Sequence, residues 1–294
     1  MQWLPAASIA FAFVTTMAVL AAWRNRAARA ARRRALAGGL PRAPGESLRR
    51  GLADAHWDAA EYAALALFVL PFAAALLAPY WHLAADAPRG EVALALAGCA
   101  AALQAWLLAR LWTVLRRARR LALAYEAELA TGRELDRLAP LGYRVFHDVP
   151  VEERGFSVDH VLVGPAGVFA VETEGRAARR ANAGGEWEVS YDGETLRFPG
   201  WRETRPLEQA VARADWVRAW LSSAVGETVP VRPLVVLPGW HVKRTAVTGI
   251  PVLAARRIGH FFRRLASEPA MSEALIQRLA QQLEGRCRGP APAL

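Results

Sequence analysis

The sequence contains little cysteine and only a single lysine, Lys243. Its two cysteines, Cys99 and Cys287, lie far apart, and neither belongs to a C-x-x-C pair. The six histidines are scattered, and no two of them have the spacing of paired metal ligands. We therefore expect neither a disulfide-stapled fold nor a zinc site. The sequence also contains no internal repeat, which argues against a solenoid or a propeller.

The net charge of +10 comes almost entirely from the first part of the chain. Residues 1–120 hold 15 arginines against 6 acidic residues, whereas residues 121–294 hold 22 basic residues against 21 acidic ones. The excess of arginine flanks apolar runs, as it does in the cytoplasmic loops of membrane proteins. We therefore interpret it as a topology signal and not as a face that binds nucleic acid.

Three apolar runs predict three transmembrane helices in residues 1–120. The start of the chain lacks the positive n-region of a cleavable signal peptide, so we expect the first run to be retained. We interpret the basic stretch between the first two runs as a solvated loop that lies against anionic lipid. The predicted helices cover residues 4–23, 62–80 and 92–115.

The distribution of arginine predicts the orientation of these helices. Arginine is dense in residues 24–34 and 116–120 and scarce in residues 82–90. Because positive loops stay in the cytoplasm, the N-terminus is expected outside, and residues 121–294 are expected inside.

The second part of the chain, residues 121–294, predicts a mixed α/β domain. A helical pattern from residue 121 precedes several short apolar strands, a second helix begins at Pro206, and a buried strand follows it. Two further helices and a loose tail complete the pattern. The predicted strands cover 143–148, a hairpin at 157–174, a second hairpin at 186–198 that turns at Asp192-Gly193, and 229–237. The last two helices are predicted at 256–266 and 271–285.

The hairpin within residues 157–174 carries the first candidate site. If its turn is the two residues Pro165-Ala166, the register places Asp159 directly opposite Glu172 on one face of the sheet. Glu174 is two residues beyond Glu172 and shares that face.

Two carboxylates that converge in a buried sheet need a partner charge. A hard cation, Mg²⁺ or Mn²⁺, is the candidate, with the Thr173 carbonyl as a further ligand of the metal that Asp159 and Glu172 bind. The alternative is that both acids lie at strand ends and are simply solvated.

Three blocks of the second part resemble the nuclease-related domain, or NERD, a bacterial family in which some members carry membrane segments. The blocks are GRELDRLAPLGYRVFHDVP, SVDHVLVGPAGVFAVET and RPLEQA, which together cover about residues 126–224. The resemblance implies a restriction-endonuclease-like fold with an αβββαβ core, and leaves residues 225–294 as a C-terminal extension.

The resemblance also implies roles for individual residues. Asp159 matches the acid of the second strand, and Glu172 matches the glutamate of the family's E-x-K motif. Glu128 matches the acid of the first helix, and Gln209 matches the polar residue that opens the second helix. Glu174 stands where the lysine is expected, so it cannot supply positive charge to a phosphate; it is a candidate base or ligand of a second metal.

Three functions are compatible with this pattern. The first is a membrane-anchored, metal-dependent nuclease of the bacterial inner membrane that cleaves DNA or RNA. The alternative is a module that has lost cleavage and binds nucleic acid or a protein partner beside the membrane. A third alternative is a membrane scaffold whose cytoplasmic domain only packs against a partner.

Overall fold

The computed structural model describes residues 42–83, 89–151, 156–177, 187–265 and 271–288, together with Ala18, Ala21 and Ala22. The described chain divides into two compact units. Residues 51–120 form the first, and residues 42–50 with 121–288 form the second. The short segment 42–50 contains the start of the first long helix, yet it belongs to the second unit.

The first unit consists of parts of two long helices, α2 (Glu46–Leu83) and α3 (Arg89–Asp136). Both are long and apolar enough to cross a membrane, judged by length and composition. The predicted spans 62–80 and 92–115 lie within them, whereas the predicted span 4–23 lies outside the described residues, apart from three alanines. Residues 46–56, expected in a loop, are helical instead, and Glu46 pairs with Arg50 one turn later at 2.6 Å.

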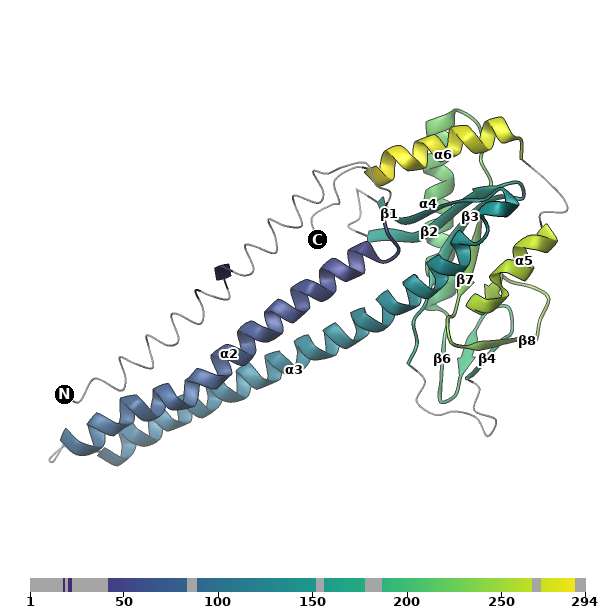
Figure 1. Ribbon diagram of the computed structural model, residues 1–294. Helices are drawn as coiled ribbons and strands as arrows, with labels where there is room; N and C mark the ends of the chain where they lie inside the picture. Colours follow the sequence, from purple (N-terminus) through teal and green to yellow (C-terminus); the bar gives the residue numbers. More distant parts are fainter. Residues whose placement is uncertain are drawn as a thin grey trace. The chain divides into compact units, whose positions relative to one another are not determined.

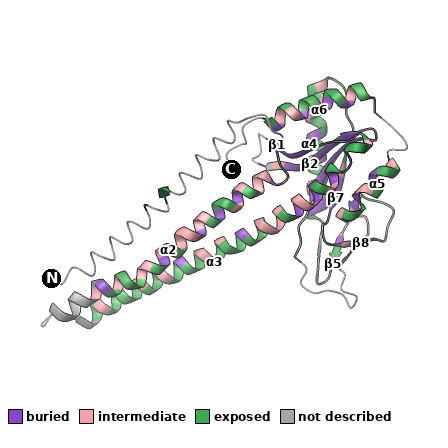
Figure 2. Cartoon of the chain, viewed as in Figure 1, coloured by how far each residue is buried: buried purple, intermediate pink, exposed green. Residues whose placement is uncertain are grey.

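Large apolar side chains point outward along both helices, where Figure 2 shows mainly exposed and intermediate residues. Leu67 is 70% exposed and Leu94 is 73% exposed. Tyr62 of α2 contacts Trp106 of α3 edge to face, with ring centroids 6.3 Å apart. Such an apolar exterior is costly in water and favourable in lipid.

The second unit is built on a five-stranded sheet in the order β1-β2-β3-β7-β9 (Figure 1). Strands β1 (Arg144–Val151), β2 (Phe156–Gly164) and β3 (Gly167–Thr173) form an antiparallel meander. Strands β7 (Val231–Val236) and β9 (Val252–Leu253) then continue the sheet in parallel with β3.

Alternate side chains of the central strands enter two apolar cores, one on each face of the sheet. Val161 and Val168 pack with α4 (Arg205–Val225) and α6 (Glu273–Arg288). Leu162 and Phe169 pack on the other face with the end of α3 and with α5 (Ile258–Leu265). Coverage of both faces explains why β3 is apolar at nearly every position.

A second sheet of four short strands was not expected from the sequence, which predicted only a hairpin in this region. Its order is β6-β5-β4-β8, and β8 runs parallel to β4 although about fifty residues separate them. The strands are β4 (Glu188–Tyr191), β5 (Leu196–Phe198), β6 (Trp201–Glu203) and β8 (His241–Arg244). Two 3-10 turns, Ala139–Leu141 and Ala255–Arg257, complete the unit.

Candidate active site

The β2–β3 hairpin has the register that the sequence predicts. Gly164 pairs with Gly167 across the two-residue turn, and the ladder continues to His160 opposite Val171. The next position along the ladder brings Asp159 beside Glu172. Gly167 has a φ of +116°, a backbone conformation that residues other than glycine rarely adopt. This end of the turn therefore requires glycine.

Asp159 and Glu172 converge on one cationic atom. Nη1 of Arg213 donates to Oδ1 of Asp159 at 2.7 Å and also to Oε2 of Glu172. The other oxygen of Asp159, Oδ2, accepts the backbone N–H of Thr173 at 2.7 Å. Both carboxylates are buried, with side chains only 8% and 4% exposed, so Arg213 offsets charges that water barely reaches.

Arg213 was not identified from the sequence. It comes from α4, whose apolar stripe of Leu207, Ala210, Ala214 and Val217 faces the sheet. Gln209, which was predicted for the site, lies one helical turn before Arg213 on the same side of α4. Among the described residues Gln209 makes no hydrogen bond to the carboxylates, so the structure places the guanidinium, and not the amide, at the acids.

Glu128 of α3 joins this cluster, as the family resemblance implies. It is 6% exposed, and its Oε2 has no hydrogen-bond partner among the described residues. Burial, together with the charges of Asp159, Asp148 and Glu172, raises the pKa of Glu128 to about 10, although Arg213 opposes that rise. The side chain is therefore a neutral acid at pH 7.

Asp148 is a further buried acid that the sequence analysis missed. It lies on β1 opposite Asp159, between the paired positions His147–His160 and Val149–Val158, and its φ of +49° breaks the ladder there. Its carboxylate accepts the backbone N–H of Ser47 at 3.1 Å and the Ser47 hydroxyl at 2.6 Å. The N-terminal turn of α2 thus holds this anion.

Arg42 strengthens the same connection. Its Nη1 donates to the Asp148 carbonyl at 3.1 Å and lies 3.4 Å from the Asp148 carboxylate. Both groups are buried. Residues 42–47 therefore belong to the site, and this explains why segment 42–50 groups with the second unit.

Glu174 occupies a different environment from the other acids. It pairs with Arg176, which in turn binds Glu203 through Nε at 2.8 Å and Nη2 at 3.0 Å. Burial raises the pKa of Glu174, and Arg176 opposes that rise. At the position of the expected lysine, the structure therefore has a carboxylate, Glu174, that is paired with the guanidinium of Arg176.

Burial dominates the electrostatics of the central acids. It raises the pKa of Asp159, and it raises that of Glu172 to well above the ordinary value, even though Arg213 lowers both. One guanidinium is too little positive charge for this group of acids.

Oxygen atoms of this kind suit a hard divalent cation, and the partnerless Oε2 of Glu128 shows that the group lacks a partner. Within the part of the chain that the structure describes, however, no three His, Cys, Asp or Glu side chains form a ready ligand set. The guanidinium of Arg213 occupies the position between Asp159 and Glu172 at which a metal ion would bind both carboxylates. Metal therefore fits the donor chemistry, and Arg213 would have to withdraw for it to bind.

His160 faces away from these acids, as expected from the alternation along β2. Its Nδ1 is 2.8 Å from Nδ1 of His147, whose Nε2 is 3.1 Å from Asp136. Burial lowers the pKa of both histidines, so this pair is a neutral, packed element of the opposite core.

With this geometry in place, the comparison with protein families is informative. Residues 123–238 match the model of the nuclease-related domain. The match contains the predicted core 126–224 and supports the NERD family for this part of the chain. The mixed α/β arrangement of two sheets with helices fits a restriction-endonuclease-like domain. With β4, β5 and β6 of the second sheet set aside, the elements follow the order α3-β1-β2-β3-α4-β7. No curated protein and no solved structure matches the chain significantly.

Proposed function

We propose that the second unit is a metal-dependent phosphodiesterase that cleaves DNA or RNA, and that α2, α3 and the apolar run 4–23 hold it at the bacterial inner membrane. The observation that carries this proposal is the convergence of Asp159 and Glu172 on a single cation. Two carboxylates on neighbouring strands that already share one cationic atom are positioned to share another. The nuclease-related family match supports the reaction class.

In this proposal Asp159, Glu172 and the Thr173 carbonyl hold Mg²⁺ or Mn²⁺. When bound, the metal polarises the phosphate and makes its water a better nucleophile. The chain's own residues supply the rest. Neutral Glu128 holds a proton beside the acids. Arg213, once the metal has displaced it from the acids, would supply the positive charge that the missing lysine would give to a phosphate.

One observation favours a second function, a module that binds nucleic acid or a protein partner without cutting. Arg213 already neutralises Asp159 and Glu172, and Glu174 replaces the lysine. A site that has lost its metal needs such an internal cation to tolerate two buried acids.

Cleavage by the full chain in neutral detergent distinguishes the two functions. Labelled single- and double-stranded DNA and RNA are incubated with Mn²⁺, with Mg²⁺ or with EDTA, beside Glu172→Ala. The nuclease requires cleavage that depends on both metal and Glu172. Binding without cleavage supports the module, and cleavage gained by Glu174→Lys would then locate the loss at that residue.

Metal binding is tested independently of cleavage. Thermal unfolding of the full chain should shift upward with Mn²⁺, because a ligand at a hundredfold excess over its Kd stabilises by about 2.7 kcal/mol. Asp159→Asn should abolish the shift, whereas Asp215→Asn, on the exposed side of α4, should keep it. A shift that survives in Asp159→Asn would place the metal elsewhere.

A further inference from the structure

Positive charge is concentrated in one segment of the second unit. Residues 228–267 contain seven arginine and lysine residues and no acidic residue, although residues 121–294 as a whole are nearly neutral. Six of its seven basic residues, all except Arg232, lie beyond the family match, which ends at residue 238. Its charge is therefore not explained by the carboxylate site.

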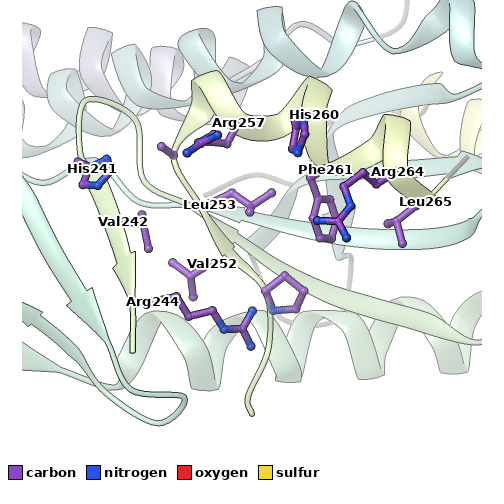
Figure 3. Close-up of a pocket in the computed structure, with 12 residues that line it drawn as sticks. His241, Val242, Arg244, Val252, Leu253, Arg257, His260, Phe261, Arg264 and Leu265 are labelled. Atoms are coloured by element: carbon purple, nitrogen blue, oxygen red, sulfur yellow. The ribbon is translucent and has the colours of Figure 1, made fainter. Parts of the chain in front are cut away.

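The segment encloses an open cavity of about 530 Å³ between β8, β9 and α5 (Figure 3). This volume is within the range of small-molecule sites. Both strands are edge strands, β8 of the second sheet and β9 of the first. The cavity thus lies where the two sheets end beside α5.

The lining of this cavity combines cations with an apolar floor. Its charged and titratable members are Arg244, Arg257, Arg264, His241 and His260, and no acidic residue is among its described lining residues. Val252, Leu253 and Phe261 are among its apolar members. Figure 3 shows Arg257, His260 and Arg264 along the helical segment on one side and Arg244 across from them.

The cations differ in how they are used by the fold. Arg244 donates to four loop carbonyls, those of residues 246–249, so it is a fixed structural charge. Arg257 is exposed, and its side chain has no hydrogen bond or ion pair to the described residues. Arg257 is therefore the cation that is available to an incoming anion.

We propose that this cavity binds a nucleoside phosphate. The phosphate would pair with Arg257, with His260 beside it, and the base would lie against Phe261 and the apolar floor. Guanidinium groups suit phosphate oxygens, and aromatic rings provide the face on which bases stack. A bare anion would leave the apolar floor unused, and a flat lipid surface would not enter a concave site.

The neighbouring surface favours a nucleic-acid strand, and not a free nucleotide, as the ligand that supplies this nucleoside phosphate. A second cavity of about 430 Å³ shares His241 and Ala254 with the first and is lined by Trp187 and Trp240. The indole N–H of Trp240 donates to the Arg176 carbonyl at 3.1 Å, and Arg176 binds Glu174. The second cavity also contains Arg256 and one acid, Glu134. Trp240 thus links this second cavity to the residues around Glu174.

Calorimetric titration of the full chain in neutral detergent with EDTA tests the site without cleavage. The probes are AMP, inorganic phosphate, glycerol 3-phosphate and a short single-stranded oligonucleotide. AMP should bind more tightly than both small phosphates. Arg257→Ala should weaken AMP binding about tenfold or more, as expected for a lost charge-assisted pair. Arg263→Ala, an equal charge change on the adjoining helix α5 and outside the cavity, should leave AMP affinity unchanged.

The results separate the ligand sources and can overturn the proposal. If the oligonucleotide displaces AMP, the natural ligand is a nucleic-acid strand. If it does not displace AMP, the natural ligand is a free nucleotide. If glycerol 3-phosphate binds as tightly as AMP, the ligand is a lipid headgroup. If inorganic phosphate binds as tightly as AMP, the cavity is a simple anion site. Either result would overturn the proposal. Equal losses in Arg257→Ala and Arg263→Ala would also overturn it. Because cleavage is not measured, failure here leaves the nuclease proposal standing.

Discussion

Replacing Arg213 by methionine should destabilise the second unit in a pH-dependent way. The substitution keeps much of the side-chain volume but leaves Asp159 and Glu172 without the cation that they share. Arg213 is 18% exposed at its side chain and the carboxylates 8% and 4%, so this is close to a fully buried pair. Removing one partner of such a pair costs about 3–5 kcal/mol.

The sign of the pH dependence follows from the raised pKa of Glu172. A carboxyl group whose folded pKa lies above its unfolded pKa contributes stability at low pH, and this contribution is lost as the pH rises through the folded value. Removing Arg213 raises the pKa of Asp159 and Glu172 further. The difference in unfolding free energy between Arg213→Met and the parent chain should therefore be small near pH 4 and largest near pH 8.

Thermal unfolding of the full chain in neutral detergent, followed by tryptophan fluorescence, measures this difference. A loss of 3–5 kcal/mol corresponds to a fall in Tm of roughly 6–20 °C for a unit of this size. Arg218→Met is the matched control, because Arg218 pairs with Asp215 on the exposed side of the same helix. It should change stability by no more than about 0.5 kcal/mol.

Mn²⁺ adds a second readout to the same variant. If metal and Arg213 compete for Asp159 and Glu172, Mn²⁺ should raise the Tm of Arg213→Met more than that of the parent. Equal stability of variant and parent at pH 8 would refute the charge argument. Equal Mn²⁺ shifts in both would refute the competition.

Three other perturbations test separate parts of the structure. Glu128→Gln should be more stable than the parent above pH 5, with a difference that grows toward pH 9 in chemical denaturation, because the parent must keep a buried proton that the amide does not need. Ser47→Ala should lose about 1–2 kcal/mol in the same assay, because it removes the hydroxyl that binds Asp148 at 2.6 Å. Topology reporters fused at residue 86 and after residue 294 should report outside and inside respectively; the reverse pattern would contradict the proposed orientation.

The central hairpin could be predicted because its information is local. Alternating and continuous apolar residues define β2 and β3, and the glycines at 164 and 167 fix the turn between them. Once the turn is known, counting residues outward from it along both strands pairs Asp159 with Glu172. The same applies to α4, whose apolar stripe and N-terminal proline mark its face and its start.

The partners of these acids could not be predicted in the same way, because they come from distant parts of the chain. Arg213 is 41 residues from Glu172, and Ser47 is 101 residues from Asp148. One signal was available for Arg213, since it follows Gln209 by one helical turn. Pairing β1 with β2 would likewise have shown Asp148 opposite Asp159.

The near-neutral charge of residues 121–294 is an average over regions of different charge, and a polyanion responds to local charge. The buried acids gather at the ends of β2 and β3, where Arg213 and Arg176 offset part of their charge. The acid-free segment 228–267 places three of its arginines, Arg244, Arg257 and Arg264, at the β8–β9–α5 cavity. If both proposals hold, the second region binds a phosphate backbone and the first cleaves it. Binding and cleavage would then depend on different residues, so they can be lost separately by substitution.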